Sequence, residues 1–214
     1  MILVLLGPPG AGKGTQARLL STEYRIPHIS TGDMFREHKA RGTELGLKIR
    51  AIMDGGGLVT DELTNALVAD RLGRPDVKDG FILDGYPRTI PQAEYLEGLL
   101  RALGRKIDAV VSYEVTEETL VDRIGGRRSC PMCGATYHIT QSPPKRALVC
   151  DKDGATLELR DDDRPENVRR RMQEYGQKTE PLKRFYRERD LLVTVDGLQS
   201  PEAVLAATRQ LVKR

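Results

Sequence analysis

A glycine-rich loop directly after a short apolar run constrains the fold of this chain more than any other stretch. Residues 1–6 are apolar and rich in Val, Ile and Leu, which predicts a buried parallel strand. The next residues have the spacing G-x-x-x-x-G-K, at Gly7, Gly12 and Lys13, and a helical pattern follows to about residue 24. The order strand, loop, helix predicts the first unit of a parallel α/β sheet.

The same loop predicts a phosphate site. Glycines reach positive φ and let backbone N–H groups approach an anion, and the N-terminus of the following helix adds partial positive charge. Lys13 supplies a mobile full charge for β- and γ-phosphates. The motif usually continues with Ser or Thr, whereas here Gly14 follows and Thr15 comes one residue later. The alternative is a glycine-rich turn without a ligand.

Strand and helix patterns alternate along the rest of the chain. Further buried strands are expected at 26–29, 81–83, 109–113 and 191–195. Helices are expected at 31–40 with Thr31 as N-cap, and at 44–53, 61–72, 89–103, 117–124, 165–189 and 201–211. This order predicts an α/β fold, a parallel sheet covered by helices on both faces, with the ligand site at the carboxyl ends of the strands.

Composition excludes several classes of protein. The chain has 214 residues, enough for one domain with small insertions. Its longest wholly apolar run is residues 1–6, far short of the roughly 20 that span a membrane. The N-terminus also lacks the basic region of a secretory signal, so we expect a cytoplasmic protein. The net charge of +3 argues against a general nucleic-acid binder.

The character of the chain changes between residues 125 and 163, which are rich in turns and poor in apolar residues. The spacing C-x2-C-x16-C-x2-D, at Cys130, Cys133, Cys150 and Asp153, predicts a structural Zn²⁺ site in a small inserted subdomain. Such a metal would hold together a segment too small to fold on its core alone. His138 or Asp151 could instead be the fourth ligand, iron or cobalt could replace zinc, or the cysteines could be reduced and free of metal.

Several segments together resemble one family. They are GPPGAGKGTQ at 7–16, ISTGDM at 29–34, LVTDEL at 58–63, LDGYPRT at 83–89, Gln92, DRI at 122–124 and GRR at 126–128. With these segments the chain resembles the adenylate kinases, P-loop nucleoside monophosphate kinases, and in particular the long bacterial form with a metal-binding lid. The resemblance covers essentially the whole chain.

This resemblance implies the reaction Mg-ATP + AMP ⇌ 2 ADP, with ATP, AMP and ADP as partners and no nucleic acid or membrane. It implies a monomer with Mg²⁺ bound alongside ATP and Zn²⁺ in the lid. It also implies a core with the P-loop (1–29, 60–125 and 164–214), an AMP-binding subdomain (30–59) and a lid (126–163).

The resemblance further implies roles for individual residues. ATP binding is expected from Gly10, Ala11, Gly12, Lys13, Gly14, Thr15, Arg123, Arg127, Thr136, Tyr137 and Gln199. AMP binding is expected from Thr31, Arg36, Gly57, Leu58, Val59, Gly85, Tyr86, Pro87, Arg88, Gln92, Arg160 and Arg171. The expected catalytic residues are Lys13, Arg88, Arg127, Arg160, Arg171, Asp162 and Asp163.

Each of these roles has a simpler alternative. An arginine can belong to a solvated surface pair worth about 1 kcal/mol or less. Asp162 and Asp163 stand in a charge run that is typical of a solvated turn. Asp84, expected to hold Mg²⁺ through water, follows a strand and could only cap the next turn.

Two other functions remain as alternatives. The first is a kinase for another monophosphate, such as UMP, CMP or GMP. The second is a zinc-ribbon nucleic-acid-binding module on a nucleotide switch. The near-neutral charge, the lack of a basic aromatic stripe and the lack of an N-K-x-D motif argue against the second.

Overall fold

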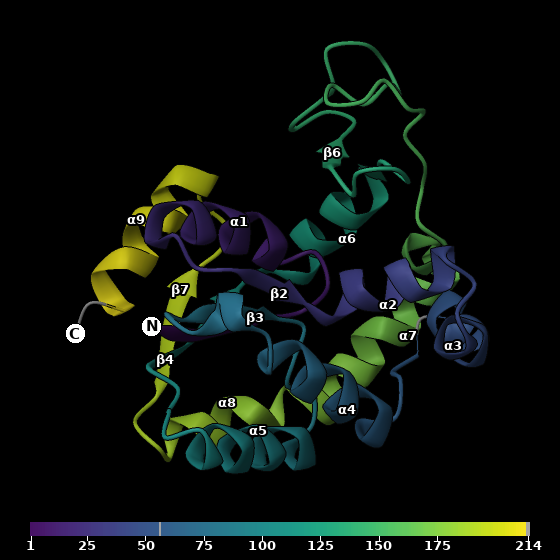
Figure 1. Ribbon diagram of the computed structural model, residues 1–214. Coiled ribbons are helices and arrows are strands. Elements are labelled where there is room, and N and C mark those ends of the chain that lie inside the picture. Colours follow the sequence, from purple (N-terminus) through teal and green to yellow (C-terminus); the bar gives the residue numbers. More distant parts are fainter. Residues whose placement is uncertain (56, 213–214) are drawn as a thin grey trace.

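A five-stranded parallel sheet forms the centre of the molecule (Figure 1). The computed structural model describes residues 1–55 and 57–212, so the last two residues of the expected core lie outside it. The strand order is β2-β3-β1-β4-β7. The strands are β1 (Ile2–Leu6), β2 (His28–Ser30), β3 (Phe81–Asp84), β4 (Ala109–Glu114) and β7 (Leu192–Asp196). The predicted parallel α/β sheet is confirmed.

Helices cover both faces of this sheet, which explains why its strands are apolar without alternation. Along β1, Ile2, Val4 and Leu6 belong to one hydrophobic core, and Leu3 and Leu5 belong to the other. The first core includes α4 (Asp61–Leu72), α5 (Ile90–Ala102) and α8 (Pro181–Arg187). The second includes α1 (Lys13–Tyr24), α6 (Glu117–Gly125) and α9 (Pro201–Val212). A short 3₁₀ turn, η1 (Pro75–Val77), precedes β3.

A pair of short helices, α2 (Thr31–Ala40) and α3 (Glu44–Asp54), forms a separate packing unit. Its small core contains Phe35, Ile49 and Val59. Gly46 allows the two helices to touch, because a Cβ at this position would lie 2.1 Å from the carbonyl oxygen of His38. The expectation that Thr31 caps α2 is wrong: Ser30 is the N-cap and its hydroxyl accepts from the Asp33 N–H.

The segment from 127 to 163 extends away from the sheet as an irregular unit (Figure 1). It contains the two-stranded antiparallel sheet of β5 (Arg127–Ser129) and β6 (Thr136–His138). Its buried core contains only Cys130, Cys150 and Leu157. The turn η2 (Asp161–Asp163) connects it to the next helix.

The expectation of a single helix at 165–189 is wrong in the middle of that range. The chain forms α7 (Pro165–Glu174), a π-helical turn η3 (Tyr175–Thr179) and then α8. Pro181 has no N–H to continue the α-helical pattern, and the Glu180 N–H instead donates to the Tyr175 carbonyl at 2.9 Å. Among the described residues no helix is long and apolar enough to cross a membrane.

Candidate active site

A cavity of about 800 Å³ lies at the carboxyl ends of the central strands. Residues of the glycine-rich loop, the α2–α3 unit and the 127–163 segment all line it. This is the position that the parallel sheet predicts for a ligand, and the volume is within the range typical of small-molecule and cofactor sites.

The glycine-rich loop encloses one end of the cavity. Gly7, Gly10 and Gly12 have φ values of 144°, 86° and 89°, which only glycine adopts readily. The ammonium group of Lys13 donates to the carbonyl oxygens of Gly7 at 2.6 Å and Pro8 at 2.9 Å. The loop therefore holds its own lysine beside the backbone N–H groups that an anion would meet.

The environment of Lys13 disfavours an uncompensated positive charge. Burial lowers the pKa of Lys13 to about 8, and the nearby charges of Arg88, Arg171 and Arg127 act in the same direction. The carboxylate of Asp84 opposes them. An anionic ligand would reverse the effect of the arginines, so this lysine is suited to a phosphate group.

Asp84 ends β3 beside the loop, in register with Leu5 of β1 and Ser30 of β2. Its Oδ2 atom lies 3.2 Å from Nε2 of His28. Burial acts to raise the pKa of Asp84, but the hydrogen bond with His28 and the charges of Lys13 and Arg88 hold it below its ordinary value. Asp84 is therefore an ionised oxygen donor at neutral pH, as a Mg²⁺ site requires.

Arginines gather opposite the loop. Burial lowers the pKa of Arg88 to about 10, and the charges of Arg171 and Arg36 add to the effect. Burial also lowers the pKa of Arg160 to about 10, with contributions from Arg36 and Arg127. Cations that repel one another inside one cavity indicate a site for a highly charged anion.

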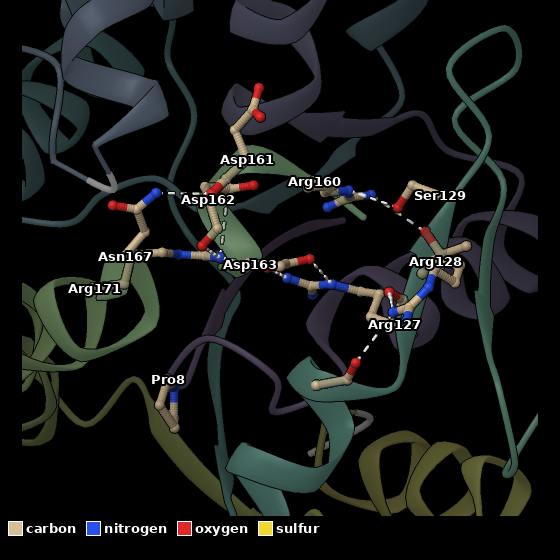
Figure 2. A network of polar contacts seen from close by, with 12 residues as sticks. Pro8, Arg127, Arg128, Ser129, Arg160, Asp161, Asp162, Asp163, Asn167 and Arg171 are labelled. Atoms are coloured by element: carbon tan, nitrogen blue, oxygen red, sulfur yellow. Dashed lines mark hydrogen bonds and ion pairs between the residues drawn. The ribbon is translucent and has the colours of Figure 1, made fainter. Parts of the chain in front are cut away.

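Two of these arginines share one buried carboxylate (Figure 2). Arg127 donates from Nε at 2.6 Å, and also from Nη2, to the two oxygens of Asp163. Arg171 donates from Nη1 to Asp163 at 2.7 Å and to the carbonyl oxygen of Asp162 at 2.9 Å. Asp163 is only 3% exposed, so the interpretation of this charge run as a solvated turn is wrong for Asp163.

The opposite end of the cavity contains a hydrogen-bonded turn at 85–92. The hydroxyl of Thr31 and Nε of Arg88 both donate to the carbonyl oxygen of Gly85, each at 2.8 Å. The side-chain amide of Gln92 is held at both ends: Oε1 accepts from the Arg88 N–H at 2.8 Å, and Nε2 donates to Asp61 at 2.7 Å.

The glycine-rich end also reaches α6 and the loop before α9. Arg123 donates from Nη2 to the carbonyl oxygen of Gly197 at 2.9 Å. Gln16 donates from Nε2 to the carbonyl oxygen of Pro201 at 2.9 Å. These bonds join three elements around a space that is lined by Thr136, Tyr137 and Gln199.

Nearly all residues expected to bind nucleotides line this one cavity. Two of the expected site residues do not: Tyr86, which is fully buried, and Asp163, which lies behind the arginines it binds. Sequence reasoning missed other polar residues at the site. The order of strands and helices along the chain does not indicate that most of these residues face a ligand. They are Gln16, Arg18, Asp33, Thr64, Glu174, Tyr175 and Thr179 on the cavity wall, with Asp61 and His28 behind it.

Four potential metal ligands converge in the 127–163 segment. One ligand atom from each of Cys130, Cys133, Cys150 and Asp153 lies within 4.8 Å of the others. The Sγ atoms of Cys133 and Cys150 are 3.6 Å apart, too far for a disulfide and close to the separation of about 3.8 Å that tetrahedral Zn–S bonds of 2.3 Å give. The donor set therefore fits zinc.

The alternative fourth ligands have other partners. Nδ1 of His138 accepts from the N–H groups of Thr140 at 3.2 Å and Gln141 at 3.0 Å, and Nε2 lies 3.2 Å from the carbonyl oxygen of Asp122. Asp151 accepts from the Lys145 N–H at 2.9 Å. Within the described part of the chain, the geometry favours Asp153.

Comparison with known proteins identifies close relatives. The family model for adenylate kinase matches residues 5–191. The chain is 68% identical over 214 residues to the adenylate kinase of Anaeromyxobacter dehalogenans (strain 2CP-1 / ATCC BAA-258), covering 100% of both chains. It is 53% identical over 204 residues to the adenylate kinase of Archaeoglobus fulgidus, covering 95% of this chain and 94% of the relative.

Proposed function

The chain belongs to the adenylate kinase family, and on that premise we propose that its large cavity is where phosphate passes between ATP and AMP. As a phosphotransferase of this family, the protein catalyses Mg-ATP + AMP ⇌ 2 ADP. The observation that supports this location best is the set of cations around one cavity, Lys13, Arg88 and Arg160, whose pKa values are each lowered by burial and by the charges of neighbouring arginines. Two nucleotides bring the several negative charges that such a set requires.

ATP is proposed to bind at the glycine-rich end. The backbone N–H groups of residues 10–15 receive its phosphates, and Lys13 exchanges its bonds to Gly7 and Pro8 for phosphate oxygens. Arg123, Thr136, Tyr137 and Gln199 surround the nucleoside. Asp84 would hold, through water, the Mg²⁺ that accompanies ATP, and the ion would supply neutralising charge to the phosphate oxygens.

AMP is proposed to bind at the opposite end. Arg36 and Arg88 grip its phosphate, and the base lies among Thr31, the 57–59 backbone and Gln92. The amide of Gln92 can donate and accept at once, which suits the edge of adenine. Gly85, Tyr86 and Pro87 form the turn that positions Arg88.

Transfer itself then needs position and positive charge more than covalent help. Arg88, Arg127, Arg160 and Arg171 surround the transferring group and stabilise the charge that it carries in the transition state. Asp162 and Asp163 orient Arg171, and Asp163 also orients Arg127.

We propose that three parts of the chain move relative to one another in this reaction. The core comprises 1–29, 60–125 and 164–214, the AMP-binding subdomain 30–59 and the lid 126–163. Closure over the nucleotides excludes water, which would otherwise accept the phosphate. A Zn²⁺ held by Cys130, Cys133, Cys150 and Asp153 keeps the lid folded.

The enzyme is proposed to act as a monomer in the cytoplasm. One chain supplies every residue of the proposed site. A site with three reduced cysteines also suits a reducing compartment. Light scattering across a range of concentrations tests the first statement, and a dimer with composite cavities would contradict it.

A panel of monophosphates tests the proposed substrate. With Mg-ATP, the purified enzyme is expected to phosphorylate AMP with a kcat/KM well above those for UMP, CMP and GMP. Turnover of UMP well above AMP would overturn the assignment of the monophosphate end.

A further inference from the structure

The side chain of Gln92 is locked in one orientation by its two partners. The Arg88 N–H can only donate, so the atom 2.8 Å from it is the amide oxygen Oε1. The carboxylate of Asp61 accepts, so the atom 2.7 Å from it is the amide nitrogen Nε2. In a flipped amide, the nitrogen would face the Arg88 N–H, which is also a donor, and the oxygen would face the Asp61 carboxylate, which is also an acceptor.

The backbone of Gln92 is equally well held. Its N–H donates to the hydroxyl of Thr89 at 3.2 Å, and its carbonyl oxygen lies 3.2 Å from the hydroxyl of Tyr86, which also donates to Asn65 at 2.6 Å. Gln92 is 2% exposed but lines the cavity. Only its amide is therefore left to meet a ligand.

One hydrogen-bonding position remains for a ligand at each end of that amide. Nε2 carries two hydrogens and Oε1 accepts two bonds, and Asp61 and the Arg88 N–H each use one of them. Adenine has an acceptor at N1 and a donor at its 6-amino group. Hypoxanthine has the reverse, a donor at N1 and an acceptor at O6. An amide with a fixed orientation suits the first base and opposes the second.

We propose that Asp61 is a positioning residue that makes the monophosphate site select adenine over 6-oxopurines, by fixing which end of the Gln92 amide donates. This inference rests on the proposed function of the cavity. Asp61 is half-buried at the start of α4, 31 residues before Gln92, and acts on the base only through that amide.

Asp61 has a second partner, which provides a matched control. Its Oδ2 accepts from the hydroxyl of Thr89 at 2.9 Å. Thr89→Val removes this bond and the cap of α5, which is the bond from the Gln92 N–H, but leaves both partners of the Gln92 side-chain amide in place. It is expected to lower stability without changing base selectivity.

The experiment compares AMP with inosine monophosphate, which differs from AMP at the base edge in question. For wild type, Asp61→Asn and Thr89→Val, kcat/KM is measured for both monophosphates at saturating Mg-ATP. The amide introduced by Asp61→Asn can donate as well as accept, so only the Arg88 N–H still favours one orientation of the Gln92 amide. In this variant the AMP-to-IMP ratio of kcat/KM is expected to fall about 10-fold, the loss typical of one charged hydrogen bond. The ratio of Thr89→Val is expected to match wild type.

Each outcome decides the proposal. A wild-type ratio in Asp61→Asn overturns it, and so does an equal fall in both variants, because that indicates a structural effect on the turn. Should Asp61→Asn melt below the assay temperature, Asp61→Ser, whose side chain is too short to reach the amide, tests the same ratio. If wild type does not phosphorylate AMP at all, the proposed function fails, a result distinct from unchanged selectivity in an active enzyme.

Discussion

Asp163 binds Arg127 through both carboxylate oxygens, and its side chain has no exposed surface. Burial acts to lower the pKa of Arg127, but the hydrogen bond and charge of Asp163 raise it above its ordinary value. The same carboxylate binds Arg171, 2.7 Å away. One buried anion thus sets the position of two cations, Arg127 from β5 and Arg171 from α7.

Removal of this anion is expected to destabilise the protein. Asp163→Asn leaves the largely buried Arg127 without the carboxylate that binds it and leaves Arg171 with only that of Asp162, 3.2 Å away, so the free energy of unfolding is expected to fall by about 3 kcal/mol. Denaturant unfolding measures it. Asp70→Asn breaks the exposed pair with Arg74 and is the control, with stability close to wild type. Equal stability of the two variants would contradict the structural role of Asp163.

The lowered pKa of Lys13 predicts a pH dependence. The group is charged below a pKa of about 8 and neutral above it, so kcat/KM for Mg-ATP is expected to fall as pH rises through 8. Bound phosphates favour the charged form, so kcat is expected to stay level to higher pH. Lys13→Arg, whose side chain stays charged, is expected to have a lower kcat/KM that does not change between about pH 7 and pH 9. A wild-type kcat/KM for Mg-ATP that is equally independent of pH would contradict the assignment of this pH dependence to Lys13.

The π-helical turn predicts a specific effect on AMP. The hydroxyl of Thr179 donates to the carbonyl oxygen of Arg88 at 2.9 Å. Thr179→Val removes this bond, and KM for AMP is expected to rise about 5-fold while KM for ATP is unchanged. Thr179→Ser restores the hydroxyl and is expected to restore KM. An equal rise in both KM values would indicate general damage instead.

The metal site predicts that substitutions of two neighbouring aspartates, Asp151 and Asp153, change the zinc content differently. Wild type, purified without chelator, is expected to contain about one zinc ion per chain. Asp153→Ala and Cys130→Ser are expected to lose zinc and to melt at lower temperature. Asp151→Asn is expected to keep its zinc, as is Asp153→Cys, which completes a four-cysteine site. Zinc retained in Asp153→Ala but lost in Asp151→Asn would reverse the assignment of the fourth ligand.

Local patterns in the sequence predict most of the fold. The three central strands β3, β1 and β4 follow from apolar runs, because strands that are buried on both faces need no alternation, whereas the edge strands β2 and β7 are only partly buried. The differences from the expected elements are small shifts of their ends and one expected helix that a π-helical turn interrupts. The strand expected at 26–29 begins two residues later, and the helix expected at 165–189 contains a π turn before Pro181.

The site was less accessible to sequence reasoning. Motifs identify residues that meet a ligand, such as Lys13, but not the residues that hold them. Asp61 and Gln92 are 31 residues apart on different helices, and no periodicity links them. Asp163 has the composition of a solvated turn and is buried only because Arg127 and Arg171 converge on it from other elements.

Lys13 is proposed to stand at the centre of a cavity that transfers phosphate between ATP and AMP. The most direct test is ADP formation from Mg-ATP and AMP by wild type and Lys13→Met, with the melting temperature of both measured in parallel. Turnover is expected to be at least about 100-fold lower in Lys13→Met, with a fold that is retained. Near-normal turnover in that variant would contradict the central role of this lysine.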